Sequence, residues 1–322
     1  MIKKSKILIT AGNPNGVGPE VTSKALSKFR LNDLSNMSVI IDRQSAYHYF
    51  REEILEICSF RFIEPSASKF TENYRFNPGE PTLEAGAMSY LFLKEATNLI
   101  KTGEFDALVT APISKEHIAE SGIENTSRFK GHTDFLAQCF DITRYNMMFY
   151  SDDLKVILAT IHIPLREVVE AVTQNTIEIA VNNAIDFLKH SNLSGNIGVC
   201  GINPHCGEGG IIGNEDYEVI APVVGKYRAS GVKIEGPVPA DTLFFRALNG
   251  DFDIVIAMYH DQGLAPFKLI HFMDGVNVTL GLPFIRTSPD HGTAFPIAGK
   301  GVANETSMFN SIRLATQWLD AR

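Results

Sequence analysis

Residues 253–268 read DIVIAMYHDQGLAPFK. The apolar, β-branched run at residues 254–257 predicts a short buried strand. His260 and Asp261 follow it, in a segment that Gly263 and Pro266 mark as a loop. Open α/β sheets bind their ligands at the carboxyl ends of parallel strands. The stretch therefore predicts a parallel α/β sheet with polar, chemically active residues where this strand ends.

Two further apolar runs also end in a histidine. Residues 156–161 lead to His162, and residues 197–204 lead to His205. If the three strands are parallel in one sheet, the imidazoles of His162, His205 and His260 can meet at one edge. Three histidines with an open fourth position are typical of a catalytic Zn²⁺ site, with Co²⁺, Mn²⁺ or Mg²⁺ as alternatives. A hydrogen-bonded loop histidine is the simpler interpretation of any one of them, and Asp261 could orient a ligand ring.

The composition indicates a globular protein of about two domains. The chain has 322 residues, of which 44 % are hydrophobic and 20 % charged. Its net charge of −8 provides no overall basic field for nucleic acid or anionic lipid. Neither a signal peptide nor a membrane-spanning run is expected. The four cysteines, Cys58, Cys139, Cys200 and Cys206, form no CxxC pair, which favours reduced thiols and a cytoplasmic location.

Strands alternate with helices along the chain, which predicts a mainly parallel, doubly wound sheet. The loop at residues 11–20 lies between a predicted strand and a predicted helix. It suits either an anion held on backbone N–H groups or a plain tight turn. Residues 290–304, DHGTAFPIAGKGVAN, form a second glycine-rich loop whose backbone could approach a ligand closely.

A cluster of basic residues indicates an anionic substrate. His132, Lys268, Arg286 and, with less support, Lys115 each lie after a predicted strand or in a glycine loop. The guanidinium of Arg286 can bind phosphate or carboxylate through two hydrogen bonds. Solvated surface charge is the alternative interpretation of each residue taken singly.

Several ordered motifs resemble the 4-hydroxythreonine-4-phosphate dehydrogenase family of pyridoxal phosphate biosynthesis. They are GVGPE at 16–20, GHT at 131–133, NPHCGEGG at 203–210, ADTLF at 240–244, MYHDQG at 258–263 and GLPFIRT at 281–287. The resemblance implies the fold of the isocitrate and isopropylmalate dehydrogenases, a homodimer of two-domain α/β chains with the active site in the interdomain cleft. We expect residues 1–130 and 270–322 to form the dinucleotide domain, and residues 131–269 to form the metal and dimer domain.

The same resemblance assigns the ligands of the site. It implies that one divalent metal, shared between the dimer partners, binds His162, His205 and His260. The implied substrate contacts are His132, Thr133, Lys268, Asn277 and Arg286. The second glycine-rich loop resembles the adenosine-binding loop of isopropylmalate dehydrogenases, which implies cofactor contacts at Gly292, Ala294, Gly299 and Asn304. Pro296 replaces the acid that would bind the ribose hydroxyls there, so NAD and NADP both stay open.

The implied reaction is a metal-assisted, NAD(P)-linked oxidation of 4-phosphooxy-L-threonine. Its product, 2-amino-3-oxo-4-(phosphooxy)butanoate, decarboxylates to 3-amino-1-hydroxyacetone phosphate. Asp241 is the candidate base, or only a cap of the helix beginning at Thr242. The alternatives are a dehydrogenase of 4-phosphothreonate or a related phosphorylated sugar acid, a metal hydrolase or aldolase, and a non-catalytic phosphometabolite-binding protein.

Overall fold

The computed structural model describes residues 6–123, 125–191, 193 and 195–321. The chain divides into two compact units: unit 1 is Met1–Ile142 with Leu282–Arg322, and unit 2 is Thr143–Gly281. The sequence placed these boundaries at residues 130 and 270. They lie further along the chain because Leu136 packs in the core of unit 1, whereas the strand at residues 276–280 pairs with a strand of unit 2.

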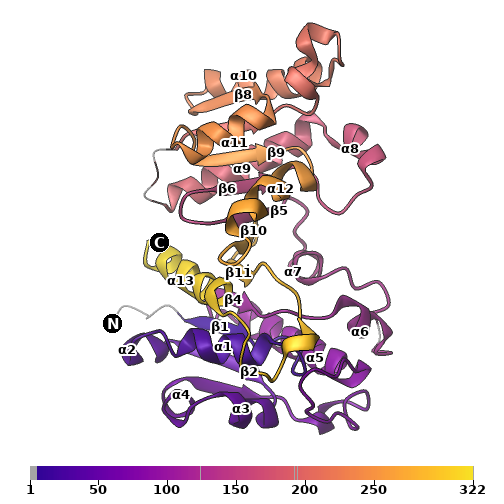
Figure 1. Cartoon of the computed structure of the whole chain (residues 1–322), viewed down its shortest axis with the longest axis vertical. Helices are drawn as coiled ribbons and strands as arrows, with labels where there is room; N and C mark the ends of the chain where they lie inside the picture. Colours follow the sequence, from indigo (N-terminus) through magenta and orange to yellow (C-terminus); the bar gives the residue numbers. More distant parts are fainter. Residues whose placement is uncertain (1–5, 124, 192, 194, 322) are drawn as a thin grey trace. The chain divides into compact units, whose positions relative to one another are not determined.

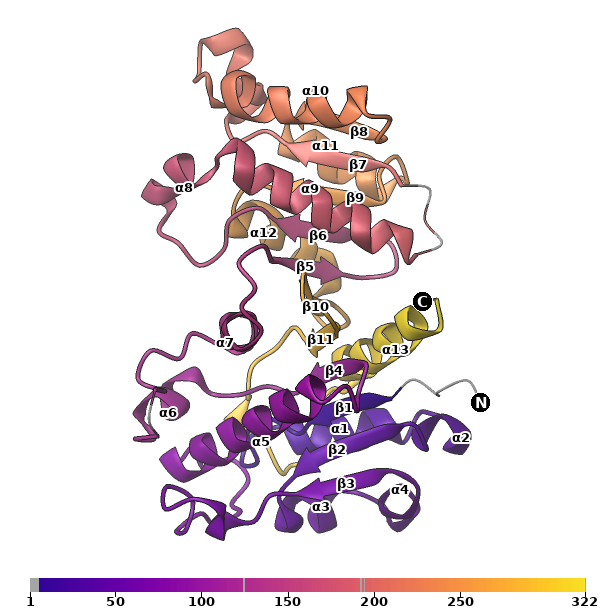
Figure 2. The same cartoon turned by 180° about the vertical axis from the view of Figure 1, so that it is seen from behind.

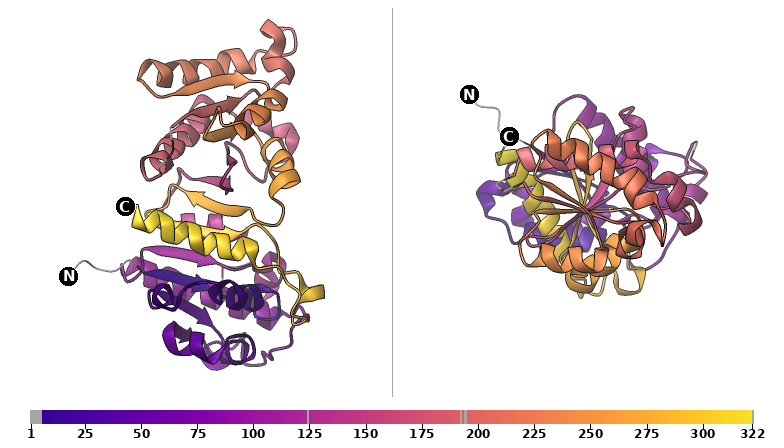
Figure 3. Two further views of the ribbon diagram at one scale, coloured as in Figure 1. Left: turned by 60° about the vertical axis from the view of Figure 1, so that its left-hand side comes forward. Right: turned by 90° about the horizontal axis from the view of Figure 1, so that it is seen from above.

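Unit 1 is built on a parallel sheet in the order β3-β2-β1-β4-β11. Helices α1 (Gly18–Leu26) and α13 (Thr306–Asp320) cover one face of it, and α5 (Leu83–Lys101) covers the other (Figures 1 and 2). Figure 3 shows α13, in yellow, lying along this sheet, where it packs on β4 and β11. The strands are β1 (Ile7–Thr10), β2 (Met37–Ile41), β3 (Ser59–Phe62), β4 (Ala107–Thr110) and β11 (Ile285–Pro289). The remaining helical segments are α2 (Leu31–Leu34), α3 (Arg43–Tyr49), α4 (Glu52–Ile57), η1 (Pro65–Ala67), α6 (Lys115–Glu120), α7 (His132–Cys139) and η4 (Phe295–Ile297).

Unit 2 contains a mixed sheet in the order β10-β5-β6-β9-β7-β8. Strand β5 is antiparallel to both of its neighbours, whereas β6, β9, β7 and β8 run parallel. Helices α11 (Ala240–Leu248) and α12 (His260–His271) lie on one face, and α9 (Gln174–Lys189) lies on the other (Figures 1 and 2). The strands are β5 (Asn146–Tyr150), β6 (Lys155–Leu158), β7 (Ile197–Cys200), β8 (Ile234–Val238), β9 (Ile254–Ala257) and β10 (Val276–Leu280). The other helical segments are α8 (Leu165–Ala171), η2 (Pro204–Gly210), η3 (Asp216–Ile220) and α10 (Ala221–Ala229).

The segment after β9 is helical, so the predicted loop at residues 260–268 is wrong. Helix α12 begins at His260 and continues through Pro266 to His271. Gly263, Phe267 and His271 are buried at a four-residue spacing, which is the period of a helix that packs one face on a sheet. A Cβ at Gly263 would lie 2.6 Å from Cδ2 of Leu158, so the glycine allows α12 to touch β6. Here close packing overrides the low helix propensity of glycine and proline.

Residues 236–238 belong to strand β8. The strand lies at the edge of the unit 2 sheet, beside β7. An edge strand tolerates Pro237, since its missing N–H need not bond to a neighbour. Throughout the part of the chain that the structure describes, no helix combines the length and the apolar character needed to span a bilayer.

Candidate functional site

The three histidine-bearing strands are neighbours, as the sequence predicted. Strand β9 lies between β6 and β7 and runs parallel to both, so the three carboxyl ends share one edge of the unit 2 sheet. His162 follows β6, His260 follows β9 and His205 follows β7. The rings of His162 and His260 lie 5.7 Å apart between centroids, tilted by 39°. Two imidazoles at this spacing can bind one ion through nitrogens about 2.0–2.1 Å from it.

Two of these histidines have a left-handed backbone. The φ angle is 44° at His162 and 51° at His205, and positive φ continues from His205 through Gly210. For a residue with a Cβ, this conformation costs about 1 kcal/mol or more. The conformation persists only where the surrounding structure enforces it. Such strain clusters at functional sites, and here it coincides with two predicted metal ligands.

Asp216 holds the loop that carries His205. Its side chain is fully buried, and its two carboxylate oxygens accept the N–H groups of Ile202 at 2.7 Å and Asn203 at 3.0 Å. The aspartate therefore fixes the chain just before His205. Its partners lie 14 and 13 positions away along the chain, so no local pattern in the sequence marks this role of Asp216.

Gln262 and Thr160 join the three strand ends to one another. The amide oxygen of Gln262 accepts the N–H of Met258 at 2.7 Å, and its Nε2 donates to the carbonyl of Gly201 at 2.7 Å. The hydroxyl of Thr160 donates to the carbonyl of Met258 at 2.7 Å. These bonds tie the end of β9 to the ends of β7 and β6. No local pattern in the sequence marks either role.

The donor set at this edge fits a divalent transition metal. Nδ1 of His260 lies 3.0 Å from Oδ1 of Asp261, which leaves Nε2 as the metal-binding nitrogen of that ring. Among the described residues of a single chain, no group of three or more His, Cys, Asp or Glu side chains is close enough together to hold a metal ion. One chain thus brings together His162 and His260, whereas His205 is placed at the neighbouring strand end.

Asp241 lies in the first turn of α11, close to the loop of His205. The helix begins at Ala240 and Pro239 is its N-cap, so Asp241 is not the cap of a helix starting at Thr242. Its Oδ1 accepts the N–H of Thr242 at 2.8 Å. Burial, together with the charges of Asp216 and Asp241, raises the pKa of Cys206 to about 11. Asp241 is the second residue of α11, which follows directly after β8, and β8 pairs with β7, the strand that leads to His205.

Unit 1 contains a buried basic centre on β11. Arg286 is only 3 % exposed, and its Nη2 donates to Oγ1 of Thr110 at 2.7 Å. Burial lowers the pKa of Arg286 to about 9. Burial also lowers the pKa of His132 well below its usual value, and the positive charges of Arg286 and Lys115 lower it further. His132 is therefore neutral at pH 7 beside two cations.

The same centre includes the start of helix α7. His132 is the first residue of this helix, and Thr133 is buried in its first turn. Lys115 begins α6, and its Cε would lie 3.1 Å from a Cβ placed at Gly131. A helix N-terminus next to buried cations favours an anion. The structure thus brings together His132, Arg286 and Lys115, as the sequence suggested.

Lys268 and Asn277, the other predicted substrate contacts, belong to unit 2. Lys268 lies on α12, with its ammonium 5.8 Å from the ring centroid of Phe272. Asn277 lies on β10 and pairs with Phe149 of β5.

The predicted cofactor residues Gly292, Ala294, Gly299 and Asn304 lie in unit 1, between β11 and α13. Backbone φ is positive at Ala294 and Gly299, at 43° and 76°. The side chain of Asn304 accepts the N–H of Thr306 at 2.8 Å. A Cβ at Gly292 or Gly301 would meet no described atom within 4 Å, so the backbone is open to a ligand at these points. The four cofactor contacts stay a prediction.

Comparisons with known proteins agree with the motifs. Residues 9–315 match the family model described as "Pyridoxal phosphate biosynthetic protein PdxA". D-threonate 4-phosphate dehydrogenase of Pectobacterium atrosepticum is 38 % identical, covering 97 % of this chain and 99 % of that protein. 4-Hydroxythreonine-4-phosphate dehydrogenase of Geobacter metallireducens is 39 % identical, covering 98 % and 95 %.

Solved structures give the same result. A crystal structure of 4-hydroxythreonine-4-phosphate dehydrogenase from Klebsiella pneumoniae aligns with a TM-score of 0.82 and 36 % identity, over 99 % of this chain and 100 % of that one. Isocitrate dehydrogenase from Methylococcus capsulatus shares the fold, with a TM-score of 0.54 at 15 % identity over 99 % and 87 % of the two chains. The predicted resemblance and fold class are confirmed. The chain belongs to the family of the pyridoxal phosphate biosynthetic protein PdxA.

Proposed function

We propose that this protein is a metal-dependent, NAD(P)-linked 4-hydroxythreonine-4-phosphate dehydrogenase. It oxidises the C3 hydroxyl of 4-phosphooxy-L-threonine to give 2-amino-3-oxo-4-(phosphooxy)butanoate. This β-keto acid loses its carboxylate as CO₂ and gives 3-amino-1-hydroxyacetone phosphate. The observation that carries the proposal is the match to the family over residues 9–315, supported by the three histidine-bearing strand ends of unit 2.

Each group of residues has a proposed task. His162, His205 and His260 would hold the metal, and the loop at residues 291–304 would hold the nucleotide. When bound, the metal would polarise the C3 oxygen and NAD(P) would accept the C3 hydride. The chain's own acid–base group is Asp241, whose carboxylate would take the proton of the C3 hydroxyl. Its position in the first turn of α11, directly after the strand that pairs with β7, supports this role.

Arg286 would bind the anionic end of the substrate, together with His132 and Thr133. Burying a guanidinium costs free energy that a phosphate or carboxylate ligand offsets. His132 is neutral beside two cations, so its ring N–H can donate a hydrogen bond to the same anion without adding charge. Lys268 and Asn277 of unit 2 would supply further substrate contacts.

A second candidate substrate is D-threonate 4-phosphate, which has a hydroxyl in place of the amino group at C2. Relatives named as dehydrogenases of this compound are 37–38 % identical to the chain over 97 % of its length. The oxidation at C3 and the loss of CO₂ are the same for both compounds, so the residue roles above do not change.

The activity test follows reduced nicotinamide at 340 nm with each substrate, and with NAD and NADP in turn. The proposal expects turnover of 4-phosphooxy-L-threonine that chelation abolishes and Zn²⁺, Co²⁺, Mn²⁺ or Mg²⁺ restores. Faster turnover of D-threonate 4-phosphate would assign the second substrate instead. Cofactor-independent turnover would indicate a metal hydrolase or aldolase, and binding without turnover would indicate a phosphometabolite-binding protein.

His205→Ala tests the metal mechanism directly. The variant should lose more than about 99 % of the turnover, since removing one of three ligands weakens the site severely. The metal mechanism fails if turnover stays at the wild-type level after the metal has been rigorously removed. Metal content by atomic emission, measured on the same samples, shows whether the ligand set has changed.

We also propose that the protein acts in the cytoplasm as a homodimer that shares the metal between subunits. The free thiols of Cys58, Cys139, Cys200 and Cys206 support a reducing compartment. Leu269 and Phe272 at the end of α12 are 86 % and 68 % exposed, and Phe245 of α11 is 69 % exposed. Helices α11 and α12 lie on the same face of the unit 2 sheet, and large exposed apolar side chains are typical of a subunit interface. Leu269→Glu combined with Phe272→Glu should give a monomer by light scattering.

A further inference from the structure

The motif GVGPE at residues 16–20 packs against the glycine loop at residues 291–304. The N–H of Val17 donates to the carbonyl of Thr293 at 2.9 Å. A Cβ at Gly16 would lie 2.9 Å from the same carbonyl oxygen, so only glycine allows this approach. The start of the loop is thereby fixed to the N-terminus of α1. The motif was a candidate anion-binding turn, and in the structure it contacts protein backbone instead.

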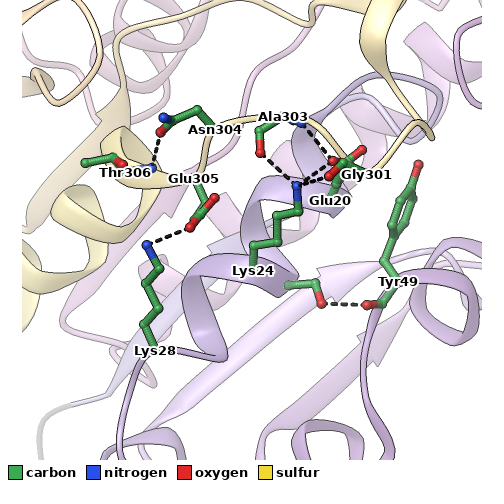
Figure 4. A network of polar contacts seen from close by, with 10 residues as sticks. Glu20, Lys24, Lys28, Tyr49, Gly301, Ala303, Asn304, Glu305 and Thr306 are labelled. Atoms are coloured by element: carbon green, nitrogen blue, oxygen red, sulfur yellow. Dashed lines mark hydrogen bonds and ion pairs between the residues drawn. The ribbon is translucent and has the colours of Figure 1, made fainter.

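The end of the loop is fixed by an ion pair on the same helix, between buried Glu20 and half-buried Lys24. Glu20 is 2 % exposed, and its Oε1 accepts the N–H of Ala303 at 3.0 Å and the ammonium of Lys24 at 2.8 Å. The ammonium of Lys24 also donates to the carbonyls of Gly301 and Ala303, both at 2.8 Å (Figure 4). Its three donors are all used. One turn of α1 therefore binds three backbone groups of the loop.

Tyr49 is held between α1 and the middle of the loop. Ser23 of α1 donates to the Tyr49 carbonyl at 2.6 Å, and the phenol oxygen lies 3.7 Å from a Cβ placed at Gly299. Burial, with the charge of Glu20, raises the pKa of Tyr49 to about 12, so the phenol stays neutral. In the view of Figure 4, Glu20 lies between Lys24 and Tyr49.

We propose that Glu20 and Lys24 are positioning residues for the nicotinamide cofactor, because together they hold residues 301–303 in the conformation that binds the nucleotide. The inference rests on the proposed function, which assigns this loop to NAD(P). A glycine-rich loop loses much conformational entropy when a ligand orders it. A loop that the ion pair has already ordered binds without that loss, which raises affinity.

The test compares Lys24→Met with Lys28→Met in the full-length protein. Lys28 lies just after α1, and its ion pair with Glu305 at 2.6 Å does not involve residues 291–304. Both exchanges keep the apolar stem and remove one ammonium. In Lys24→Met, the Kd of NADH or NADPH, from nucleotide fluorescence, should rise about tenfold. The kcat at saturating cofactor, the KM of the phosphorylated substrate and the affinity for Zn²⁺ should stay as in the wild type. Lys28→Met should change none of these.

Amide hydrogen exchange gives a second measurement that needs no ligand. The amide of Ala303 should exchange about tenfold faster in Lys24→Met than in Lys28→Met. Lys24→Met could fail to fold because Glu20 is left buried and unpaired. In that case the double variant Glu20→Gln with Lys24→Met tests the positioning role, since it removes both charges. That variant should show the same loss of nucleotide affinity.

The outcomes separate the two proposals. A wild-type protein that binds neither NADH nor NADPH would remove the cofactor assignment itself, and the positioning role with it. Wild-type binding with an equal Kd in the Lys24 and Lys28 variants would overturn the positioning role alone. Faster exchange at Ala303 with an unchanged Kd would overturn it as well, because the ordered loop would then make no difference to the nucleotide.

Discussion

The side-chain amide of Gln262 donates a 2.7 Å hydrogen bond to the carbonyl of Gly201, a residue 61 positions earlier in the chain. The amide oxygen of the same side chain accepts the N–H of Met258 at 2.7 Å. One residue therefore sets the distance between the end of β9, which leads to His260, and the end of β7, which leads to His205. Gln262 is not itself a metal donor, yet it controls where two proposed donors lie.

Gln262→Glu should weaken metal binding about tenfold. A carboxylate can still accept the N–H of Met258, but it repels the carbonyl of Gly201. The end of β7 should then shift relative to β9. Competition with a chelating dye measures the Zn²⁺ affinity. Gln174→Glu on α9 is the control, since its contact with the Glu218 carbonyl is a long one of 3.5 Å. Equal Zn²⁺ affinities in the two variants would contradict the role of Gln262.

Arg286→Met should abolish anion binding without lowering the stability of the ligand-free protein. The exchange removes a cation that is 3 % exposed and whose pKa burial lowers to about 9. Replacing a buried charge by an apolar side chain of similar length is often neutral or stabilising, here by about 1 kcal/mol. Inorganic phosphate at a hundredfold excess over its Kd should add about 2.7 kcal/mol to the wild-type free energy of unfolding, and nothing to the variant.

Urea unfolding with and without phosphate checks the Arg286 prediction. Arg61→Met is the matched control, because the Arg61 side chain is 61 % exposed in its 2.7 Å ion pair with Glu95. That exchange should change stability by less than about 1 kcal/mol and keep the phosphate effect. The prediction fails if Arg286→Met is still stabilised by phosphate as strongly as the wild type.

His132 should make the metal-free protein less stable in acid. Burial and the charges of Arg286 and Lys115 lower its pKa well below 6.5 in the folded state. As the pH falls below about 6.5, the unfolded chain binds a proton that the folded chain does not, so stability is lost down to the folded pKa. Above about pH 6.5 the contribution is fully present.

His132→Gln should therefore lose less stability than the wild type between about pH 7.5 and pH 5.5. Urea unfolding at both pH values gives the two differences. His48→Gln, the same exchange at an exposed position, controls for the removal of an imidazole. Identical losses in His132→Gln and the wild type would show that His132 is protonated in the folded protein.

Gly263→Ala and Gly225→Ala should have effects of opposite sign, although both glycines lie in helices. A Cβ at Gly263 would lie 2.6 Å from Leu158 and 2.9 Å from Val156, which should destabilise the protein by about 1–3 kcal/mol. A Cβ at Gly225 of α10 would meet no described atom within 4 Å, so alanine should stabilise by about 0.5–1 kcal/mol. Thermal unfolding measures the change in stability of both variants. If Gly263→Ala leaves the stability unchanged, α12 does not pack directly on β6.

The features that the sequence predicted correctly are those that local patterns encode. Apolar runs marked β6, β7 and β9, and the polar residues after them marked the strand ends at which His162, His205 and His260 lie. Their parallel order could be inferred because strands alternate with helices. The basic centre of His132 and Arg286 was recognisable for a similar reason, since it lies where predicted elements begin or end.

The features that were missed depend on contacts between distant parts of the chain. Helix α12 looked like a loop because Gly263 and Pro266 lower helix propensity, and only its packing on β6 shows why it is helical. The bond from Gln262 to Gly201 spans 61 positions, and the bond from Glu20 to Ala303 spans 283. No periodicity in the sequence marks such pairs, because strand order and register decide which residues meet.

The antiparallel pairing of β5 with β10 has a consequence for how the chain reaches its fold. Unit 2 interrupts unit 1 in the sequence, yet Asn146 pairs with Leu280, so the two ends of unit 2 lie on neighbouring strands. Closing a flexible loop of the length of unit 2 would cost about 4 kcal/mol of chain entropy. Once β5 and β10 have paired, that closure is complete. Bringing the two halves of unit 1 together then costs only the chain entropy of joining segments linked by a short turn. The order of folding that this favours runs from the inserted unit outward to the chain ends.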